Sequence, residues 1–552
     1  MSVTDPITAA LMAEGGPFEV VTQDVRGKSL RVFKNAPETL TDIIDGARQH
    51  GEAEFLVSGS RRLTFDGFFE QADGFAARLV HDFGVTPGQS VAICMKNSPE
   101  WMMSFVGILR AGGVVILVNS RGTAKTMLEA VEDTDSVLVL TDKKRHELLA
   151  GIGCKALLVN MAEMGDLRSE HPTPSVKRGA DELAAMFFTS GTTGSAKAAA
   201  MSHRALVTGV MNGQMAMVAI FQKMAAAYNI DVETLKSQMP QSCSLLVFPL
   251  FHTSGCSSIF LTTLINGGKI VIMERWSAEG ALKLMQEERV TILGGVPATH
   301  WDLLTYDGLD DYDLSSLVSI SSGGQAFPRN LMSALRERFP KAYIGAGYGM
   351  TETSGSVSQA NGEALWSRLE ASGTILPMMD VRISGDNGEA LELGQTGEIW
   401  VKGAALMTEY YGRPDDTNAA FSGDWFKTGD VGFIDEDDYI YIVDRKTDMV
   451  ISGGENIYCV EVEAAISKHP DVLQICTFGI PDDRLGEKLI ACYVPQNRDL
   501  SPEDMKQFAN EKLAAYRVPK QFICVMEPFK LNAMSKVEKR KIRESFLAGE
   551  YS

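Results

Sequence analysis

Strand-like and helix-like segments alternate along residues 90–140, and this alternation is the feature that most restricts the folds open to the chain. Apolar runs at 90–94, 114–118 and 136–140 are separated by segments of helical periodicity, the first with apolar residues at i, i+4 and i+7 from Trp101. Consecutive strands joined by helices run parallel, whereas strands joined by short turns form hairpins. The order therefore predicts βαβ units and an α/β fold.

A further apolar stretch is followed by a run of glycine and hydroxyl residues that ends in a lysine. Residues 186–197 read Met-Phe-Phe-Thr-Ser-Gly-Thr-Thr-Gly-Ser-Ala-Lys. Glycine lets the backbone approach an anion, hydroxyls donate hydrogen bonds, and lysine adds a positive charge, so the run predicts a phosphate cradle. The alternative is an ordinary surface turn, against which the density of donors argues. The predicted cradle residues are Thr189, Ser190, Gly191, Thr192, Thr193, Gly194 and Lys197.

Composition limits the partners and the compartment that we expect. The 552 residues are 45% hydrophobic and 22% charged, which suits a large core and more than one domain. With 71 acidic and 52 basic residues the net charge is −19, which disfavours nucleic acid and anionic membrane surfaces. The eight cysteines show no C-x-x-C spacing, so we expect neither a zinc site nor disulfides, and a cytoplasmic location. We expect no leader peptide and no transmembrane segment.

The cradle differs from the loop of the common nucleotide triphosphatases, because Ala196 and Ala198 stand where that loop needs glycine and a serine or threonine. Its order, Thr-Ser-Gly-Thr-Thr-Gly-x-x-Lys, instead resembles the signature of the adenylate-forming enzymes. That superfamily contains acyl-CoA synthetases, peptide-synthetase adenylation domains and luciferases. The resemblance extends over about residues 39–543, and six motifs follow the family's order.

Several later motifs resemble the nucleotide site of this family. The turn after the apolar run at 318–320 resembles its adenine-binding turn. Residues 347–352, Gly-Tyr-Gly-Met-Thr-Glu, combine an aromatic face, a hydroxyl and a carboxylate, which suit adenine, an α-phosphate and Mg²⁺. A glycine-rich turn with a solvated acid is the alternative reading of this run. By resemblance, the ATP- or AMP-binding residues beyond the cradle are Gly324, Gln325, Ala326, Tyr348, Gly349, Thr351, Asp430 and Arg445, with Glu352 as the metal ligand.

The resemblance also divides the chain and assigns roles near its C-terminus. It implies a large N-terminal domain, residues 1–446, with parallel and mixed sheets and flanking helices, and a small mobile α+β domain, residues 447–552. Thr447 stands at the hinge position, and Gly453 and Gly454 match the CoA-binding turn. Lys536 matches the catalytic lysine, although Ser535 stands where glycine is usual. The lysines at 539 and 541 fall inside a predicted helix and match less well.

The family implies an AMP-forming acid–thiol ligase that uses ATP, Mg²⁺ and coenzyme A, with Lys197, Thr351, Glu352 and Lys536 as catalytic residues. His252 stands where peptide-synthetase domains carry aspartate, which argues against an amino-acid substrate; a structural histidine is the alternative. We place His252 and Cys256 in the acyl pocket.

Apolar residues near these positions favour an apolar acid. A medium- or long-chain fatty acid is our first expectation, followed by aryl and alicyclic acids. A ligase that loads a carrier protein and a non-catalytic nucleotide-binding homologue are also compatible with the motifs. We allow for a homodimer.

Overall fold

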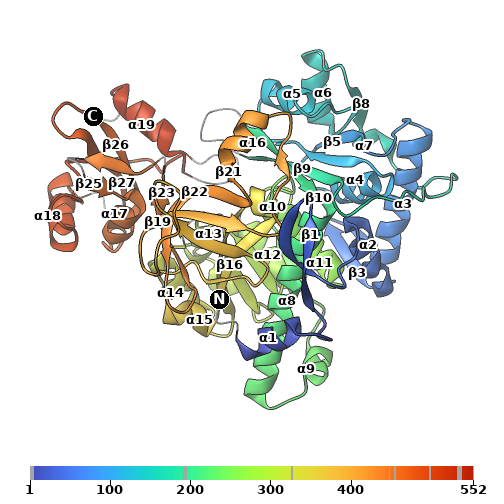
Figure 1. Ribbon diagram of the computed structural model, residues 1–552, viewed down its shortest axis with the longest axis horizontal. Coiled ribbons are helices and arrows are strands. Elements are labelled where there is room, and N and C mark those ends of the chain that lie inside the picture. The colour runs from blue at the N-terminus through green and yellow to red at the C-terminus, as the bar shows by residue number, and fades with distance from the viewer. Residues whose placement is uncertain are drawn as a thin grey trace.

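The computed structural model describes residues 5–189, 196–324, 327–446, 448–452, 455–496, 499–530 and 537–550. Within these ranges the strands form five sheets, of which four lie before residue 447 and one after it. The sheet after residue 447 and its helices form a separate lobe, on the left of Figure 1, beside the much larger body. An antiparallel pair near the N-terminus, β1 (Val20–Val25) and β2 (Lys28–Phe33), follows α1 (Pro6–Met12).

A seven-stranded sheet contains the βαβ units that the sequence predicts. Its order is β20-β10-β9-β6-β5-β7-β8, and every pair from β9 to β8 is parallel. Ser98 caps the first crossover helix by accepting a hydrogen bond from the backbone N–H of Trp101. Its strands are β5 (Ser90–Cys94), β6 (Val114–Leu117), β7 (Leu138–Thr141), β8 (Leu157–Asn160), β9 (Leu183–Thr189), β10 (Lys197–Ser202) and β20 (Glu409–Tyr410). Its helices are α4 (Pro99–Arg110), α5 (Ala124–Glu132), α6 (Lys143–Gly151) and α7 (Met161–Met164).

A nine-stranded sheet with mixed strand directions lies beside it. The order is β17-β16-β15-β14-β13-β11-β12-β3-β4, with parallel pairs from β15 to β3 and antiparallel pairs at both edges. Its strands are β3 (Glu54–Ser58), β4 (Arg61–Thr64), β11 (Cys243–Leu246), β12 (Lys269–Ile272), β13 (Ile292–Gly295), β14 (Ser319–Ser322), β15 (Tyr343–Met350), β16 (Gly355–Asn361) and β17 (Thr374–Ile375). Its helical segments are α12 (Ala278–Glu287), α13 (Pro297–Leu304), η3 (Leu309–Asp311), α14 (Arg329–Arg338), η4 (Thr351–Thr353) and α15 (Glu363–Ser367).

Helices from both sheets share one large core. Trp101 stacks on Phe105, and both pack edge-on against Phe260 with no solvent exposure. The long helix α8 (His203–Tyr228) is apolar enough for a membrane span by length and composition, but half of its most apolar window is buried and it packs on α1, α2 and η2. The remaining helical segments here are α2 (Leu40–Asp45), η1 (Gly46–His50), α3 (Phe65–His81), α9 (Val232–Gln238), α10 (Thr253–Gly255), η2 (Cys256–Leu261) and α11 (Thr262–Ile265).

Two five-stranded sheets complete the chain. The first has the order β18-β19-β22-β21 with β23 beside β22, and the second the order β25-β24-β27-β26 with β28 beside β27. The first contains β18 (Asp380–Ser384), β19 (Gly397–Lys402), β21 (Phe421–Ser422), β22 (Trp425–Ile434) and β23 (Ile440–Arg445), with α16 (Pro414–Ala420). The second contains β24 (Val450–Ser452), β25 (Glu455–Ile457), β26 (Val472–Asp482), β27 (Gly486–Pro495) and β28 (Gln521–Cys524), with α17 (Cys459–Ile466), α18 (Pro502–Lys512) and α19 (Lys539–Leu547).

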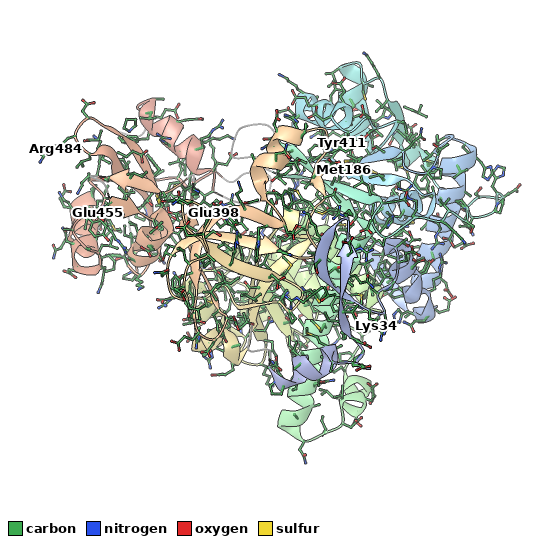
Figure 2. All side chains as sticks on the ribbon, in the orientation of Figure 1. Lys34, Met186, Glu398, Tyr411, Glu455 and Arg484 are labelled. Carbon is green, nitrogen blue, oxygen red and sulfur yellow. The ribbon has the colours of Figure 1, made fainter. Side chains whose placement is uncertain are left out.

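These elements confirm the predicted fold class. The second sheet begins three residues after the predicted boundary at 447, and Glu455 and Arg484 mark its lobe in Figure 2. The boundary itself and the mobility of the lobe stay predictions.

Candidate active site

A cleft of about 240 Å³ opens where strands of both large sheets end. Strand β9 ends at Thr189, β15 ends at Met350, and the loop after β11 begins close by. In open α/β sheets, ligands bind at the carboxyl ends of the parallel strands. The cleft is lined by Phe188, Thr189, Lys197, Phe248, Pro249, His252, Thr253, Ser254, Val296, Gly323, Gly324, Gly349, Met350, Thr351, Glu352, Tyr410, Phe426, Lys427, Thr428 and Arg445.

The structure brings most of the described site residues that the sequence predicts to this cleft. Eight of them line it: Thr189, Lys197, His252, Gly324, Gly349, Thr351, Glu352 and Arg445. Tyr348 and Asp430 are buried and bonded to each other, and Asp430 is also paired with Arg445. Cys256 is fully buried in the core and does not line the cleft, so its place in the acyl pocket stays a prediction. The other predicted residues lie outside the described ranges: Ser190, Gly191, Thr192, Thr193, Gly194, Gln325, Ala326, Thr447, Gly453, Gly454 and Lys536.

Lys197 occupies the first position of β10, where register pairs it with Thr189 of β9. Its ammonium Nζ lies 2.5 Å from Oδ1 of Asp416, in the first turn of α16, and 5.2 Å from the centre of the Tyr410 ring. Tyr410 lies on β20, which pairs with the other edge of β10. Figure 2 labels Met186 and Tyr411, which belong to the segments on either side of β10. The cradle lysine is therefore held by an aromatic face and a carboxylate.

Glu352 lies in the turn between β15 and β16, and only 8% of its surface is exposed. The Tyr410 hydroxyl donates a 2.8 Å hydrogen bond to its Oε1 atom. Burial raises the pKa of the Glu352 carboxyl, against the hydrogen bond from Tyr410, which lowers it. Burial and the nearby Glu352 charge raise the pKa of the Tyr410 phenol, so this hydroxyl stays a donor. Tyr410 thus contacts both the predicted metal ligand and the predicted cradle lysine.

A single carboxylate suits the metal that we predict. Among the described residues, no group of three or more His, Cys, Asp or Glu side chains gathers to hold a metal ion. Mg²⁺ is usually bound through one or two carboxylates together with substrate phosphates and water. Glu352 at the cleft wall could bind Mg²⁺ in this way, whereas a structural metal site would need several protein ligands.

A second hydrogen-bonded set lies behind the cleft wall. Tyr348 donates from its hydroxyl to Oδ2 of Asp430 at 2.7 Å, and Nε of Arg445 lies 3.0 Å from Oδ1 of the same carboxylate. Asp430 and Arg445 are direct register partners on β22 and β23. Burial and the Asp430 charge raise the pKa of Tyr348. The predicted ribose-binding aspartate is therefore fixed in orientation by two donors.

Two features fix the backbone around Glu352. Thr353 holds the turn after β15, since its hydroxyl accepts from the Met350 N–H at 3.1 Å and lies 2.6 Å from the Gly355 carbonyl oxygen. At Gly349, a Cβ atom would lie 2.0 Å from that same carbonyl oxygen, so only glycine fits. These contacts explain the glycine and hydroxyl residues around Glu352.

His252 lies at the N-terminal end of α10, with its ring 4.5 Å from that of Phe251. A second cavity, of about 180 Å³, is lined in part by the η2 segment that follows α10. The Ser257 hydroxyl in its wall is buried and has no hydrogen-bond partner among the described residues. The cavity is lined by Gly209, Val210, Gly213, Ser257, Ser258, Thr262, Ser354, Gly355, Ser356, Gln359 and Leu376.

Comparison with known proteins identifies the family. A family model described as AMP-binding enzyme matches residues 44–411, and one described as AMP-binding enzyme C-terminal domain matches residues 461–536. The chain belongs to the AMP-binding enzyme family. It is 30% identical over 504 residues to a feruloyl-CoA synthase of Amycolatopsis sp., with 91% of this chain and 97% of that protein covered. It is 30% identical over 488 residues to a 2-succinylbenzoate–CoA ligase of Bacillus licheniformis, with 88% and 96% covered.

Solved structures of AMP-binding enzymes agree with this assignment. An o-succinylbenzoate CoA synthetase from Bacillus subtilis, in complex with its acyl-adenylate intermediate, superposes with a TM-score of 0.77 at 26% identity, covering 91% of this chain and 97% of that one. The same enzyme in complex with ATP and a magnesium ion also superposes with a TM-score of 0.77 at 26% identity, covering 91% of this chain and 99% of that one. The predicted superfamily, fold class and enzyme class, an AMP-forming acid–thiol ligase, are confirmed. The predicted ATP, Mg²⁺ and coenzyme A agree with these relatives.

Two residues that organise the site of this AMP-binding enzyme were not predicted from the sequence. Tyr410 and Asp416 lie more than 200 positions after Lys197 in the chain. The pairing of β20 with β10 brings them to the cleft. One sequence signal could have located Asp416. Proline is favoured in the first turn of a helix, so Pro414 predicts a helix start that has Asp416 in its first turn.

Proposed function

We propose that this protein is an ATP-dependent ligase that activates an aromatic carboxylic acid as an acyl-adenylate and then transfers the acyl group to coenzyme A. The observation that carries the proposal is the convergence of Lys197, Glu352 and Arg445 on one cleft, with Asp430 paired to Arg445 behind its wall. The loop with His252 forms another wall of the same cleft. These groups match the phosphate, metal and ribose contacts that adenylation needs.

In the first half-reaction, a carboxylate oxygen of the acid attacks the α-phosphorus of ATP, a new P–O bond forms, and pyrophosphate leaves. Negative charge grows on the phosphoryl oxygens, and charged donors fixed in advance stabilise it best. Lys197 and the Thr351 hydroxyl are in place at the cleft wall, and we assign the same task to Lys536. A Mg²⁺ ion held by Glu352 would add Lewis-acid stabilisation of the phosphates.

In the second half-reaction, the CoA thiol attacks the acyl carbon, the thioester forms, and AMP leaves. We assign the hinge of a domain rotation to Thr447 and the approach of the pantetheine arm to Gly453 and Gly454. Such alternation is a hinge-type domain movement. The described lobe after residue 447 contributes no residue to the wall of the cleft, which leaves room for a rearrangement of that lobe between the two steps.

The class of acid is inferred from the relatives and from the cavities. Feruloyl and 2-succinylbenzoyl groups are aromatic, so these relatives favour the aryl acid over the fatty acid that the sequence alone leads us to expect. Phe188, Phe248 and Val296 give the cleft apolar lining together with His252, and the two phenylalanine rings could stack on an aromatic acid. The second cavity carries several hydroxyl groups, and the buried Ser257 hydroxyl would stay unpaired against an alkyl chain. An aromatic acid with an oxygen-bearing substituent suits this lining.

A panel of acids tests the proposal. Ferulate, 4-coumarate, benzoate, 2-succinylbenzoate, octanoate and palmitate are supplied with ATP and Mg²⁺, with and without coenzyme A, and release of pyrophosphate and AMP is measured. We expect the highest kcat/KM with an aromatic acid that bears an oxygen substituent, and acyl-CoA as the product. Preference for octanoate or palmitate would refute the aromatic assignment, and ADP as the product would refute adenylation.

A further inference from the structure

The positive charge of Lys197 is already balanced within the protein. Its ammonium lies 2.5 Å from Oδ1 of Asp416, and the two side chains are 16% and 34% exposed. An ion pair at this depth is screened by water less than an exposed surface pair. The proposed cradle needs Lys197 to bind phosphate. The Asp416 carboxylate is therefore bound to the same ammonium group that an oligophosphate would use.

The position of Asp416 is set by the fold. Helix α16 begins at Pro414 and packs on β20. The Thr417 hydroxyl, next to Asp416, accepts a hydrogen bond from the backbone N–H of Tyr410 at 3.0 Å and donates to the Arg413 carbonyl oxygen at 2.9 Å. The helix is thus tied to the strand whose Tyr410 ring lies against Lys197. Asp416 is held beside the lysine, and side-chain rotation suffices to separate them.

We propose that Asp416 is an internal counter-anion that holds Lys197 in the absence of oligophosphate and thereby sets how strongly the enzyme prefers ATP and pyrophosphate over AMP. This inference rests on the proposed function. When the β- and γ-phosphates arrive, they compete with Asp416 for Lys197, and like charges at close range repel. AMP lacks these phosphates, so its binding does not involve this competition. Asp416 is a positioning residue, since it acts through Lys197.

The same exchange assists product release. After adenylation, pyrophosphate carries its charge away from Lys197, and Asp416 returns to the ammonium. Without Asp416, the departing pyrophosphate would leave an uncompensated, partly buried cation behind, which disfavours its departure. The carboxylate therefore weakens the binding of ATP but speeds the release of pyrophosphate.

The chain offers a matched control for the test. Asp415 precedes Asp416 on the same helix, is exposed, and is not the carboxylate that pairs with Lys197. Asp415→Asn and Asp416→Asn remove the same formal charge from neighbouring positions. Affinities for MgATP, AMP and inorganic pyrophosphate are measured by calorimetry on the wild type and on both variants, and Asp416→Ser repeats the test in a second uncharged variant.

We expect Asp416→Asn and Asp416→Ser to bind MgATP and pyrophosphate about 5- to 30-fold more tightly than the wild type, while AMP affinity stays unchanged. Unchanged AMP binding also shows that the variants are folded. Weaker MgATP binding, or affinities equal to those of Asp415→Asn, would overturn the inference. A wild-type protein that binds none of the three ligands would instead refute the proposed function, so the two failures are distinguishable.

Discussion

Replacement of Tyr410 by phenylalanine tests how Glu352, the proposed metal ligand, is kept ionised. The change removes the hydroxyl that donates to Glu352 Oε1 at 2.8 Å but retains the ring that faces Lys197. Both side chains are largely buried, with 9% and 8% exposed, so this hydrogen bond is one of the few polar contacts open to the carboxylate. A hydrogen bond to a charged group contributes about 1.5–3 kcal/mol, so its loss disfavours the ionised carboxylate and raises the pKa of Glu352 further.

The assay is the pH dependence of kcat/KM for MgATP. Under the proposal that ionised Glu352 holds Mg²⁺, the acidic limb of the profile moves to higher pH in Tyr410→Phe. On that limb kcat/KM falls by about 10- to 100-fold, and activity recovers at high pH. Tyr411→Phe is the matched control, since the Tyr411 hydroxyl lies 3.5 Å from Asp135 and away from Glu352. Identical profiles for the two variants would refute the idea that Tyr410 controls Glu352.

The same substitution has a stability consequence with a defined sign. The pKa of Glu352 in the folded protein already lies above its ordinary value, so stability falls as the pH rises from that ordinary value to the folded-state pKa. Loss of the Tyr410 donor increases this penalty. Tyr410→Phe should therefore lower the Tm more at high pH than at about pH 5.

Four further predictions concern Lys536 and Lys539 near the C-terminus, Asp444 on β23, and Gly349 at the cleft wall. Lys536→Ala should lower the rate of acyl-adenylate formation by about 10²–10³-fold, while thioester formation from synthetic acyl-adenylate survives. Lys539→Ala should instead lower the Tm, because the Lys539 ammonium is buried and paired with Glu463. Burial raises the pKa of Asp444 to about 6, so the protein loses stability as the pH rises toward that value. Asp444→Asn removes this penalty and should raise the free energy of unfolding by about 2–3 kcal/mol at pH 8 and by less at pH 5. Urea unfolding at the two pH values measures the difference. Gly349→Ala should abolish nucleotide binding in calorimetry, because its Cβ would lie 2.0 Å from a backbone carbonyl oxygen.

Features encoded by local pattern could be predicted from the sequence. The apolar runs at 90–94, 114–118 and 136–140 correspond to β5, β6 and β7 to within two residues. Strands and crossover helices depend on side-chain periodicity, which is visible in a short window. The predicted cradle lysine and the Gly-Tyr-Gly-Met-Thr-Glu run, which spans the end of β15 and the turn after it, are likewise continuous in the sequence, and both reach the cleft.

Features that depend on register between distant strands could not be predicted. Tyr410 and Asp416 join the site only because β20 pairs with β10, and strand pairing at this separation leaves no periodic signal. Cys256 follows His252 closely in sequence, but its side chain is fully buried in the core and is not part of the cleft wall, so its place in an acyl pocket stays a prediction. Proximity in the chain alone does not fix the direction in which a side chain points.

The central claim is that the chain forms an acyl-adenylate before coenzyme A takes part. The direct measurement is exchange of labelled pyrophosphate into ATP, followed with an aromatic acid present and coenzyme A absent. Reversible adenylation predicts exchange that depends on the acid and on Mg²⁺, with net AMP release only after coenzyme A is added. Absence of exchange together with formation of ADP and phosphate would contradict the account.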